Sequence, residues 1–184
     1  ATGDAQLSDA AMGTLAAQAR FIEQQKRMEM PLAELPEEQF ANFISVWRRQ
    51  REDLSDDLAG SVEARIRQMR AENEARLSLL ERTAAGLGAR ADVALSLTHA
   101  GAALFLTTLA HKAGQDRDIA VVSTNDRQLV RFALSLRAAG LSPAETRAQL
   151  RCLHPDATMP AAIGQVSRAD ARALLESSPF GHAE

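Results

Sequence analysis

The fold is decided by three similar segments, LLERTAAGLG (residues 79–88), LAHKAGQD (residues 109–116) and LRAAGLS (residues 136–142). In each, an alanine-rich helix end runs into a glycine, and these glycines, 28 and 26 residues apart, are Gly86, Gly114 and Gly140. Glycine has no Cβ and can therefore take the left-handed conformation that ends a helix. Two residues later, Asp116 and Ser142 can cap a new helix, and Gly88 is a tolerated cap. The pattern predicts three helix–turn–helix hairpins packed in series over residues 77–156.

The composition is that of a globular chain whose core is poor in aromatic side chains. Of 184 residues, 46% are hydrophobic, 24% are charged and only 4% are aromatic, so Ala and Leu must fill most of the core. The net charge of −3 does not favour a polyanion-binding protein. The single cysteine leaves no internal disulfide, which makes a cytoplasmic setting the expectation. No apolar run approaches the roughly 20 residues that cross a bilayer, and no hydrophobic targeting segment opens the sequence.

The first part of the chain predicts a long helix from Asp9 to about Met28, with Ser8 as its N-cap and residues 1–6 loose. Its apolar residues fall on two faces, which is typical of a helix sandwiched between partners. One face carries a stripe made of Met12, Leu15, Ala16, Ala19 and Ile22. The opposite face carries Phe21, close to Ala17 and Met28.

Two further helices are expected over residues 37–59 and 62–85, separated at Gly60-Ser61. The first carries a stripe that should bury the largest apolar area of this half, Phe40, Phe43, Ile44, Trp47, Arg51, Leu54 and Leu58. The second is expected to form the ion pairs Glu63–Arg67 and Glu72–Arg76. Asn73 falls on its apolar stripe, where it either sets the register of a coiled-coil seam or faces water on a rotated helix. The two helices are expected to pack on each other or on a second chain, so a homodimer through residues 37–83 is possible.

The remainder predicts short helices, at about 89–98, 101–112, 117–123, 126–138, 143–153 and 168–176. Asn125 and Ser142 each precede Gln or Glu by three residues, which is the pattern of a capping box. Pro155 and Pro160 predict an irregular link, and Ser167 is expected to open the last helix. The organisation predicted is all-α, with a long-helix bundle or dimerising hairpin over residues 1–85, hairpin repeats over 86–176 and a frayed tail over 177–184.

Residues 104–155 resemble the C-terminal part of an uncharacterised helical family common in alphaproteobacteria, with HEAT-like repeats. The matching residues follow Leu106-x-x-Leu109-Ala110-x-x-Ala113-Gly114 and, later, LRAAGL over 136–141. The resemblance implies a bacterial protein with an all-helical repeat fold, and it supplies no catalytic residue.

The one cluster with nucleophile, base and carboxylate is Cys152, His154 and Asp156. A thiol activated by an imidazole is one interpretation. The other, which we favour, is a buried small cysteine and a histidine at a helix end, because residues two apart on a helix point apart. His99 and His111 lack the neighbouring ligands of a zinc site, and His111 beside Lys112 matches no phosphotransfer motif. We therefore expect no catalytic, cofactor-binding or metal-ligating residue.

DNA binding is the main rival to protein binding. A DNA-reading helix must present Arg, Lys, Asn or Gln to base edges. Residues 116–122 are acidic and then apolar, whereas residues 143–153 offer Arg147, Gln149 and Arg151. The prediction is a non-enzymatic interaction or regulatory module that holds a partner's apolar helix in a groove between hairpins, its protein partner unknown and no cofactor bound. The alternative is a transcriptional regulator that uses the 143–153 helix, which requires Arg147 and Arg151 to face solvent.

Overall fold

A computed structural model describes residues 2–51, 53–72 and 75–178, and every regular element in these ranges is a helix. The predicted all-α class is therefore confirmed. The chain divides into two compact units, residues 1–82 and 83–184. Within the described ranges, no helix combines the length and the apolar character needed to cross a membrane.

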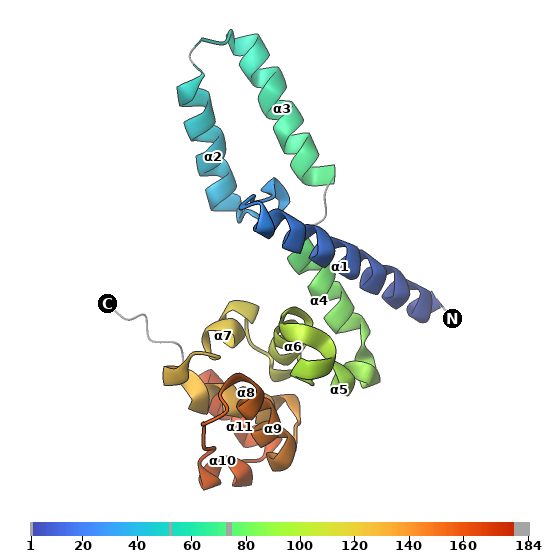
Figure 1. Ribbon diagram of the computed structural model, residues 1–184, viewed down its shortest axis with the longest axis vertical. Coiled ribbons are helices and arrows are strands. Elements are labelled where there is room, and N and C mark those ends of the chain that lie inside the picture. The colour runs from blue at the N-terminus through green and yellow to red at the C-terminus, as the bar shows by residue number, and fades with distance from the viewer. Residues whose placement is uncertain (1, 52, 73–74, 179–184) are drawn as a thin grey trace. The chain divides into compact units, whose positions relative to one another are not determined.

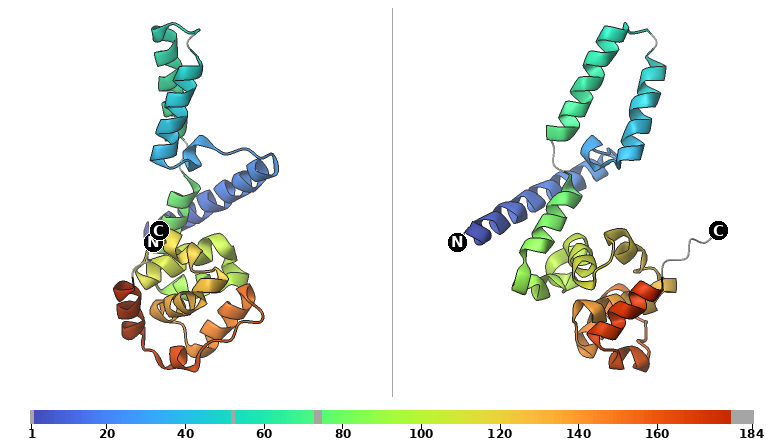
Figure 2. Two further views of the ribbon diagram at one scale, coloured as in Figure 1. Left: turned by 90° about the vertical axis from the view of Figure 1, so that its left-hand side faces the viewer. Right: turned by 180° about the vertical axis from the view of Figure 1, so that it is seen from behind.

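The first unit contains α1 (Thr2–Lys26), a 3₁₀ turn η1 (Leu32–Glu34), α2 (Glu37–Gln50), α3 (Asp56–Glu72) and the start of α4 (Arg76–Gly86). Helices α2 and α3 run side by side as an antiparallel hairpin, and α1 extends past the base of that hairpin (Figure 1 and Figure 2). Phe40 is buried in the hairpin, with the Arg70 guanidinium 4.2 Å from its ring centroid. Arg70 also donates to the carbonyl oxygen of Leu35, so one arginine holds α3 against the start of α2.

Three predicted helix boundaries in this unit are wrong. Helix α1 begins near the start of the chain, so residues 3–6 are helical and Ser8 lies inside α1 instead of capping it. The predicted 37–59 helix ends at Gln50, because Ser55 provides a new start: its Oγ accepts from the Leu58 N–H, and Asp56 and Asp57 follow it in the first turn of α3. Gly60 and Ser61 then fall within α3.

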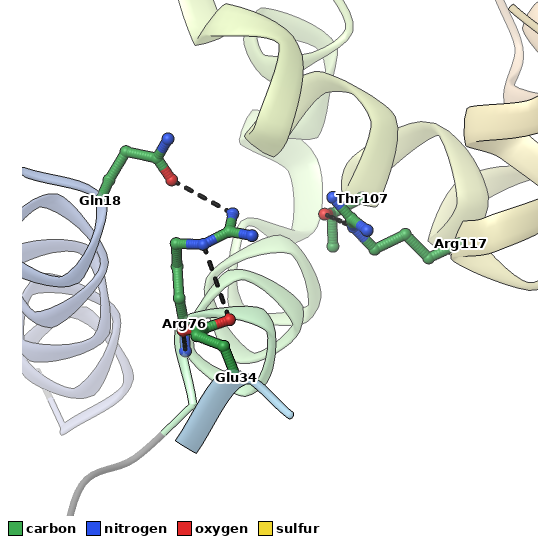
Figure 3. Close-up of polar contacts among 5 residues, drawn as sticks. All are labelled: Gln18, Glu34, Arg76, Thr107 and Arg117. Atoms are coloured by element: carbon green, nitrogen blue, oxygen red, sulfur yellow. Dashed lines mark hydrogen bonds and ion pairs between the residues drawn. The ribbon is translucent and has the colours of Figure 1, made fainter. Parts of the chain in front are cut away.

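The predicted 62–85 helix is also divided, because a side chain from elsewhere caps the start of α4. The backbone N–H of Arg76 donates to Glu34 Oε1 over 2.8 Å. Figure 3 shows the Arg76 guanidinium between Gln18 of α1 and Glu34 of η1, and it also lies 4.2 Å from the Phe21 ring centroid. Arg76 and Glu34 are only 12% and 10% exposed, so this pair fastens α1, η1 and α4 inside the unit.

The remaining predictions for this unit have mixed outcomes. The Glu63–Arg67 pair forms, and the pKa of Glu63 is lowered by the hydrogen bond from Arg67, with Arg48 adding a second charge. On the aromatic stripe, Phe40 and Ile44 are buried, whereas Phe43 is 38% exposed. Asn73 and the side chain of Glu72 lie outside the described part of the chain, as does the predicted tail from residue 179 on.

The second unit contains η2 (Gly88–Arg90), α5 (Ala91–Ala94), α6 (Leu97–Ala113), α7 (Arg117–Val122), η3 (Asp126–Gln128), α8 (Leu129–Ala139), α9 (Pro143–Leu153), α10 (Ala161–Gln165) and α11 (Arg168–Ser177). Helix α8 packs against α6, α9 and α11. In the core of this unit, Phe105 and Phe132 pack edge to face with ring centroids 6.3 Å apart, and both are fully buried. The buried aliphatic side chains of Leu109, Leu136 and Leu150 belong to the same core.

Left-handed glycines end α6 and α8, as predicted for two of the three repeats. Gly114 (φ 71°) and Gly140 (φ 109°) follow α6 and α8. In the first repeat, the left-handed residue is Gly88 (φ 53°) and not Gly86, which is the last residue of α4. Gly101 also has positive φ, with φ 70° and ψ 161°, and it kinks α6 after its first turn. The predicted helix start at residue 101 is therefore wrong: α6 begins at Leu97, and residue 101 is the position of its kink.

Two further boundaries differ from the prediction, whereas the predicted caps at Ser142 and Ser167 are present. The 89–98 helix is a 3₁₀ turn followed by one α-helical turn, and α10 forms inside the predicted irregular link, directly after Pro160. The capping box at Ser142 is present, and its hydrogen bonds to Glu145 lower the pKa of that carboxyl. Ser167 caps α11 by accepting from Asp170 N–H, as expected. Asn125 caps a 3₁₀ turn by accepting from the Arg127 N–H, two residues on, instead of from Gln128 as the predicted box requires.

Two arginines one turn apart on α11 donate to backbone carbonyls at the C-terminal ends of α6 and α8. Arg172 donates to the carbonyl oxygen of Lys112 over 2.7 Å, and Arg168 donates to that of Ala138 over 3.1 Å. Lys112 and Ala138 each stand two residues before a left-handed glycine, so these are equivalent carbonyls in two repeats. The last carbonyls of a helix lack partners within it, and the guanidinium groups supply them.

Candidate functional site

One cleft of the second unit has a volume of about 760 Å³ and lies where α6, α7, α8 and α11 approach one another. The left-handed Gly114 turns the chain between α6 and α7, and this turn forms one wall. The cleft is lined by Ala110, His111, Ala113, Gly114, Gln115, Asp116, Ile119, Arg131, Arg172, Leu175 and Glu176. It therefore lies between the second repeat and the last helix of the unit.

The lining separates into an apolar floor and a rim that carries both signs of charge. Ala110, Ala113 and Leu175 are buried and form the floor together with the half-buried Ile119. The exposed side chains at the rim are His111, Asp116, Arg172 and Glu176. Such a lining suits a ligand with an apolar face and polar edges, because apolar contact supplies affinity and the few charges fix orientation.

A chain of hydrogen bonds holds one wall of the cleft in place. Gln115 Nε2 donates to Ser135 Oγ over 2.9 Å, and Ser135 Oγ donates to the carbonyl oxygen of Arg131 over 3.0 Å. The other end of the Gln115 amide is different: its Oε1 is buried and accepts no hydrogen bond within the described chain. An unpaired buried acceptor of this kind costs free energy.

The predicted nucleophile and base are not assembled as a catalytic pair. Cys152 is exposed, so the expectation of a buried cysteine is wrong. His154 Nδ1 lies 2.8 Å from Asp126 Oδ1, and Nε2 lies 2.7 Å from the carbonyl oxygen of Thr124. Both ring nitrogens therefore face oxygen atoms, and this arrangement directs neither of them to the thiol. The acid beside His154 is Asp126 and not the neighbouring Asp156.

The other two histidines of the described chain are separated. His99 Nδ1 lies 2.7 Å from Ser96 Oγ at the start of α6, whereas His111 lies in its last turn, at the cleft rim. Within the described ranges, no three His, Cys, Asp or Glu side chains converge as metal ligands would.

Of the three α9 side chains that the DNA-binding alternative needs, two are exposed and one is engaged within the protein. Arg147 and Arg151 are both exposed, which satisfies the requirement set by that alternative. Gln149 is not available for base contacts, because its Oε1 accepts the Leu97 N–H over 2.9 Å. It also lines a smaller cavity of about 310 Å³.

Most cleft residues were not candidates from the sequence. His111 was considered singly, whereas Gln115, Arg131 and Arg172 come from three elements that only the fold brings together. Arg117 illustrates the same point: it donates from α7 to Thr107 Oγ1 of α6 over 3.1 Å, a contact between residues ten apart (Figure 3). No family model, curated protein or solved structure matches this chain, so the resemblance over residues 104–155 stays a prediction.

Proposed function

We propose that this protein is a non-enzymatic interaction module that binds an amphipathic segment of a partner protein in the α6–α7–α8–α11 cleft. The observation that carries the proposal is the cleft itself: about 760 Å³ with an apolar floor and a rim of both charge signs. A helix with an apolar face would pack on the floor, and its polar edges would meet the rim. The proposal includes the cytoplasmic setting expected from the single cysteine.

Two further observations support a binding role over a catalytic one. His154, the histidine nearest in sequence to the only cysteine, is engaged with Thr124 and Asp126. A rim that is charged but exposed suits recognition of a complementary surface.

The experiment is a peptide-display selection on the full chain, with two arginine substitutions on α7 as the matched pair. Ile119→Arg puts a charge on the cleft floor, whereas Val122→Arg changes an exposed residue of the same helix outside the cleft. Peptides that bind the wild type and Val122→Arg, but not a folded Ile119→Arg variant, would support the proposal. Equal binding to all three chains, or no enrichment of amphipathic sequences, would refute it.

A second candidate, DNA binding through α9, rests on the exposure of Arg147 and Arg151. Its electrostatic support is small, because the second unit holds ten Lys and Arg against nine Asp and Glu, a net charge of +1. Four of its arginines also donate to backbone carbonyls, namely Arg131, Arg137, Arg168 and Arg172. Fluorescence anisotropy with mixed-sequence duplex DNA at low salt tests this candidate; affinity lost in Arg147→Ala/Arg151→Ala would favour it over the cleft.

A further inference from the structure

We infer that the exposed apolar face of α1 is the seam of an antiparallel homodimer, in which α1 of one copy packs on α1 of a second. This surface belongs to the first unit, so it is separate from the cleft and goes beyond the proposed function. It also differs from the dimer expected through residues 37–83, which the experiment below distinguishes from it.

Helix α1 has one apolar face covered by its own unit and a second apolar face open to solvent. Ala10, Thr14 and Ala17 are buried, at spacings that place them on one side. On the other side Met12, Leu15 and Ile22 are 64%, 65% and 47% exposed, and Ala16 and Ala19, also exposed, lie between them. The stripe predicted from the sequence is thus present and uncovered. Exposed apolar patches of this kind are commonly interaction sites.

No charged residue interrupts this stretch of α1 between Asp9 and Arg20. A solvated helix face ordinarily carries charged side chains among its apolar ones. The N-terminal part of α1 also extends beyond the α2–α3 hairpin, so those two helices do not cover it (Figure 1 and Figure 2). The face is therefore suited to another helix.

The spacing of large and small side chains makes the face complementary to itself in one orientation. In an antiparallel pair whose two-fold axis crosses the exposed face at the level of residue 17, Leu15 of each copy meets Ala19 of the other, and Met12 meets Ile22. A leucine side chain then fills the space that an alanine leaves, on both sides of the two-fold axis. A parallel pair would set Leu15 against Leu15 and Ala19 against Ala19, which alternates crowding with gaps.

The charge distribution along α1 favours the same orientation. Within α1, residues 2–14 carry Asp4 and Asp9 and no base, whereas residues 15–26 carry Arg20 and Lys26 against Glu23, with which Lys26 forms an ion pair. An antiparallel pair places each acidic half beside a basic half, and it also sets the two helix dipoles in opposition. A parallel pair would bring like charges together at both ends. Packing and charge thus select a second copy of this chain as the occupant.

The size of the face sets the expected strength of the dimer. One helix face on each copy buries less than the roughly 1,200 Å² at which standard interfaces begin. We therefore expect dissociation in the micromolar range, with a mass that rises with concentration.

The first experiment is sedimentation equilibrium of the full chain from low to high micromolar concentration. Leu15→Glu places a charge at the centre of the face, and Val93→Glu is the control, because Val93 of α5 is equally exposed at 67% and lies off the face. We expect the wild type and Val93→Glu to dimerise alike and Leu15→Glu to weaken the dimer at least about tenfold. Monomers at every concentration, or a dimer that Leu15→Glu leaves intact, would overturn the inference; the latter would return the seam to residues 37–83.

The second experiment tests the orientation by oxidative cross-linking in a Cys152→Ser background, which removes the only native thiol. Chains carrying Leu15→Cys are mixed with chains carrying Ala19→Cys. The antiparallel seam predicts that mixed 15–19 disulfides dominate, because like positions are offset by four residues, about 6 Å along the axis. Predominant 15–15 and 19–19 products would show a parallel pair and refute the inferred seam.

Discussion

Two glycines, one inside α6 and one directly after it, allow backbone strain to be measured, because a side chain added at either position would contact no other atom. Neither Gly101 nor Gly114 has any atom within 4 Å of the position a Cβ would take. Replacement by alanine therefore changes only the backbone energy and the entropy of the unfolded chain. At Gly114, φ 71° and ψ 40° place alanine in the left-handed region, which costs about 1–2 kcal/mol. Alanine also lowers the conformational entropy of the unfolded chain, which stabilises the fold by about 0.4–1 kcal/mol, so the net destabilisation should be near 1 kcal/mol.

At Gly101, φ 70° and ψ 161° lie in a region that is nearly exclusive to glycine. The strain there reaches about 3 kcal/mol, so the net cost of Gly101→Ala should be about 2 kcal/mol. Urea unfolding at 25 °C, followed by circular dichroism, gives both values. Gly60→Ala is the control for the unfolded-state effect, because Gly60 lies inside α3 with open space around it and should gain about 0.5–1 kcal/mol. If Gly101→Ala were as stable as the wild type, the kink in α6 would not be a requirement of the fold.

Three further outcomes follow from contacts already described. Ser142→Ala should cost about 1 kcal/mol and raise the lowered pKa of Glu145 towards its ordinary value. The lowered pKa stabilises the fold only while the Glu145 carboxylate is ionised, so its contribution is present at neutral pH and is lost as the pH falls through the folded-state pKa. Urea titrations of the wild type and Ser142→Ala should therefore show a smaller difference in unfolding free energy at acidic pH than at neutral pH. A difference that did not change with pH would count against a role of the carboxylate. Arg76→Met should cost about 3 kcal/mol, since it leaves a buried carboxylate without its guanidinium, and an unchanged denaturation midpoint would contradict this. The exposed Cys152 should react with a disulfide reagent at the rate of an ordinary thiol, and His154→Ala should leave that rate unchanged; a large drop would reveal an activated pair.

The sequence predicted those features of the fold that depend on neighbours along the chain. Gly114, Gly140 and the Ser142 capping box are local, since each acts within one turn of helix. One of the boundaries predicted wrongly depends on residues far apart in sequence. Helix α4 begins where Glu34, 42 residues earlier, accepts its first N–H, and no window around Arg76 contains that information.

The candidate site was even less accessible to sequence reasoning. The cleft joins Gln115, Arg131 and Arg172, which share no spacing or motif. Periodicity did locate the apolar stripe of α1, yet it could not say which of the two apolar faces the unit would cover. The structure covers the face of Ala17 and leaves Leu15 in solvent.

The two arginines of α11 have a consequence for the order in which the second unit folds. Arg172 and Arg168 bond carbonyls that precede them by 60 and 30 residues, so these bonds close long loops. Helices α6 and α8 can form before that closure, with water on their terminal carbonyls until α11 docks. Docking of α11 is therefore expected to follow the rate-limiting step of folding, and replacing either arginine should accelerate unfolding while leaving the folding rate nearly unchanged. The resistance of this unit to unfolding over time would then depend on its last helix.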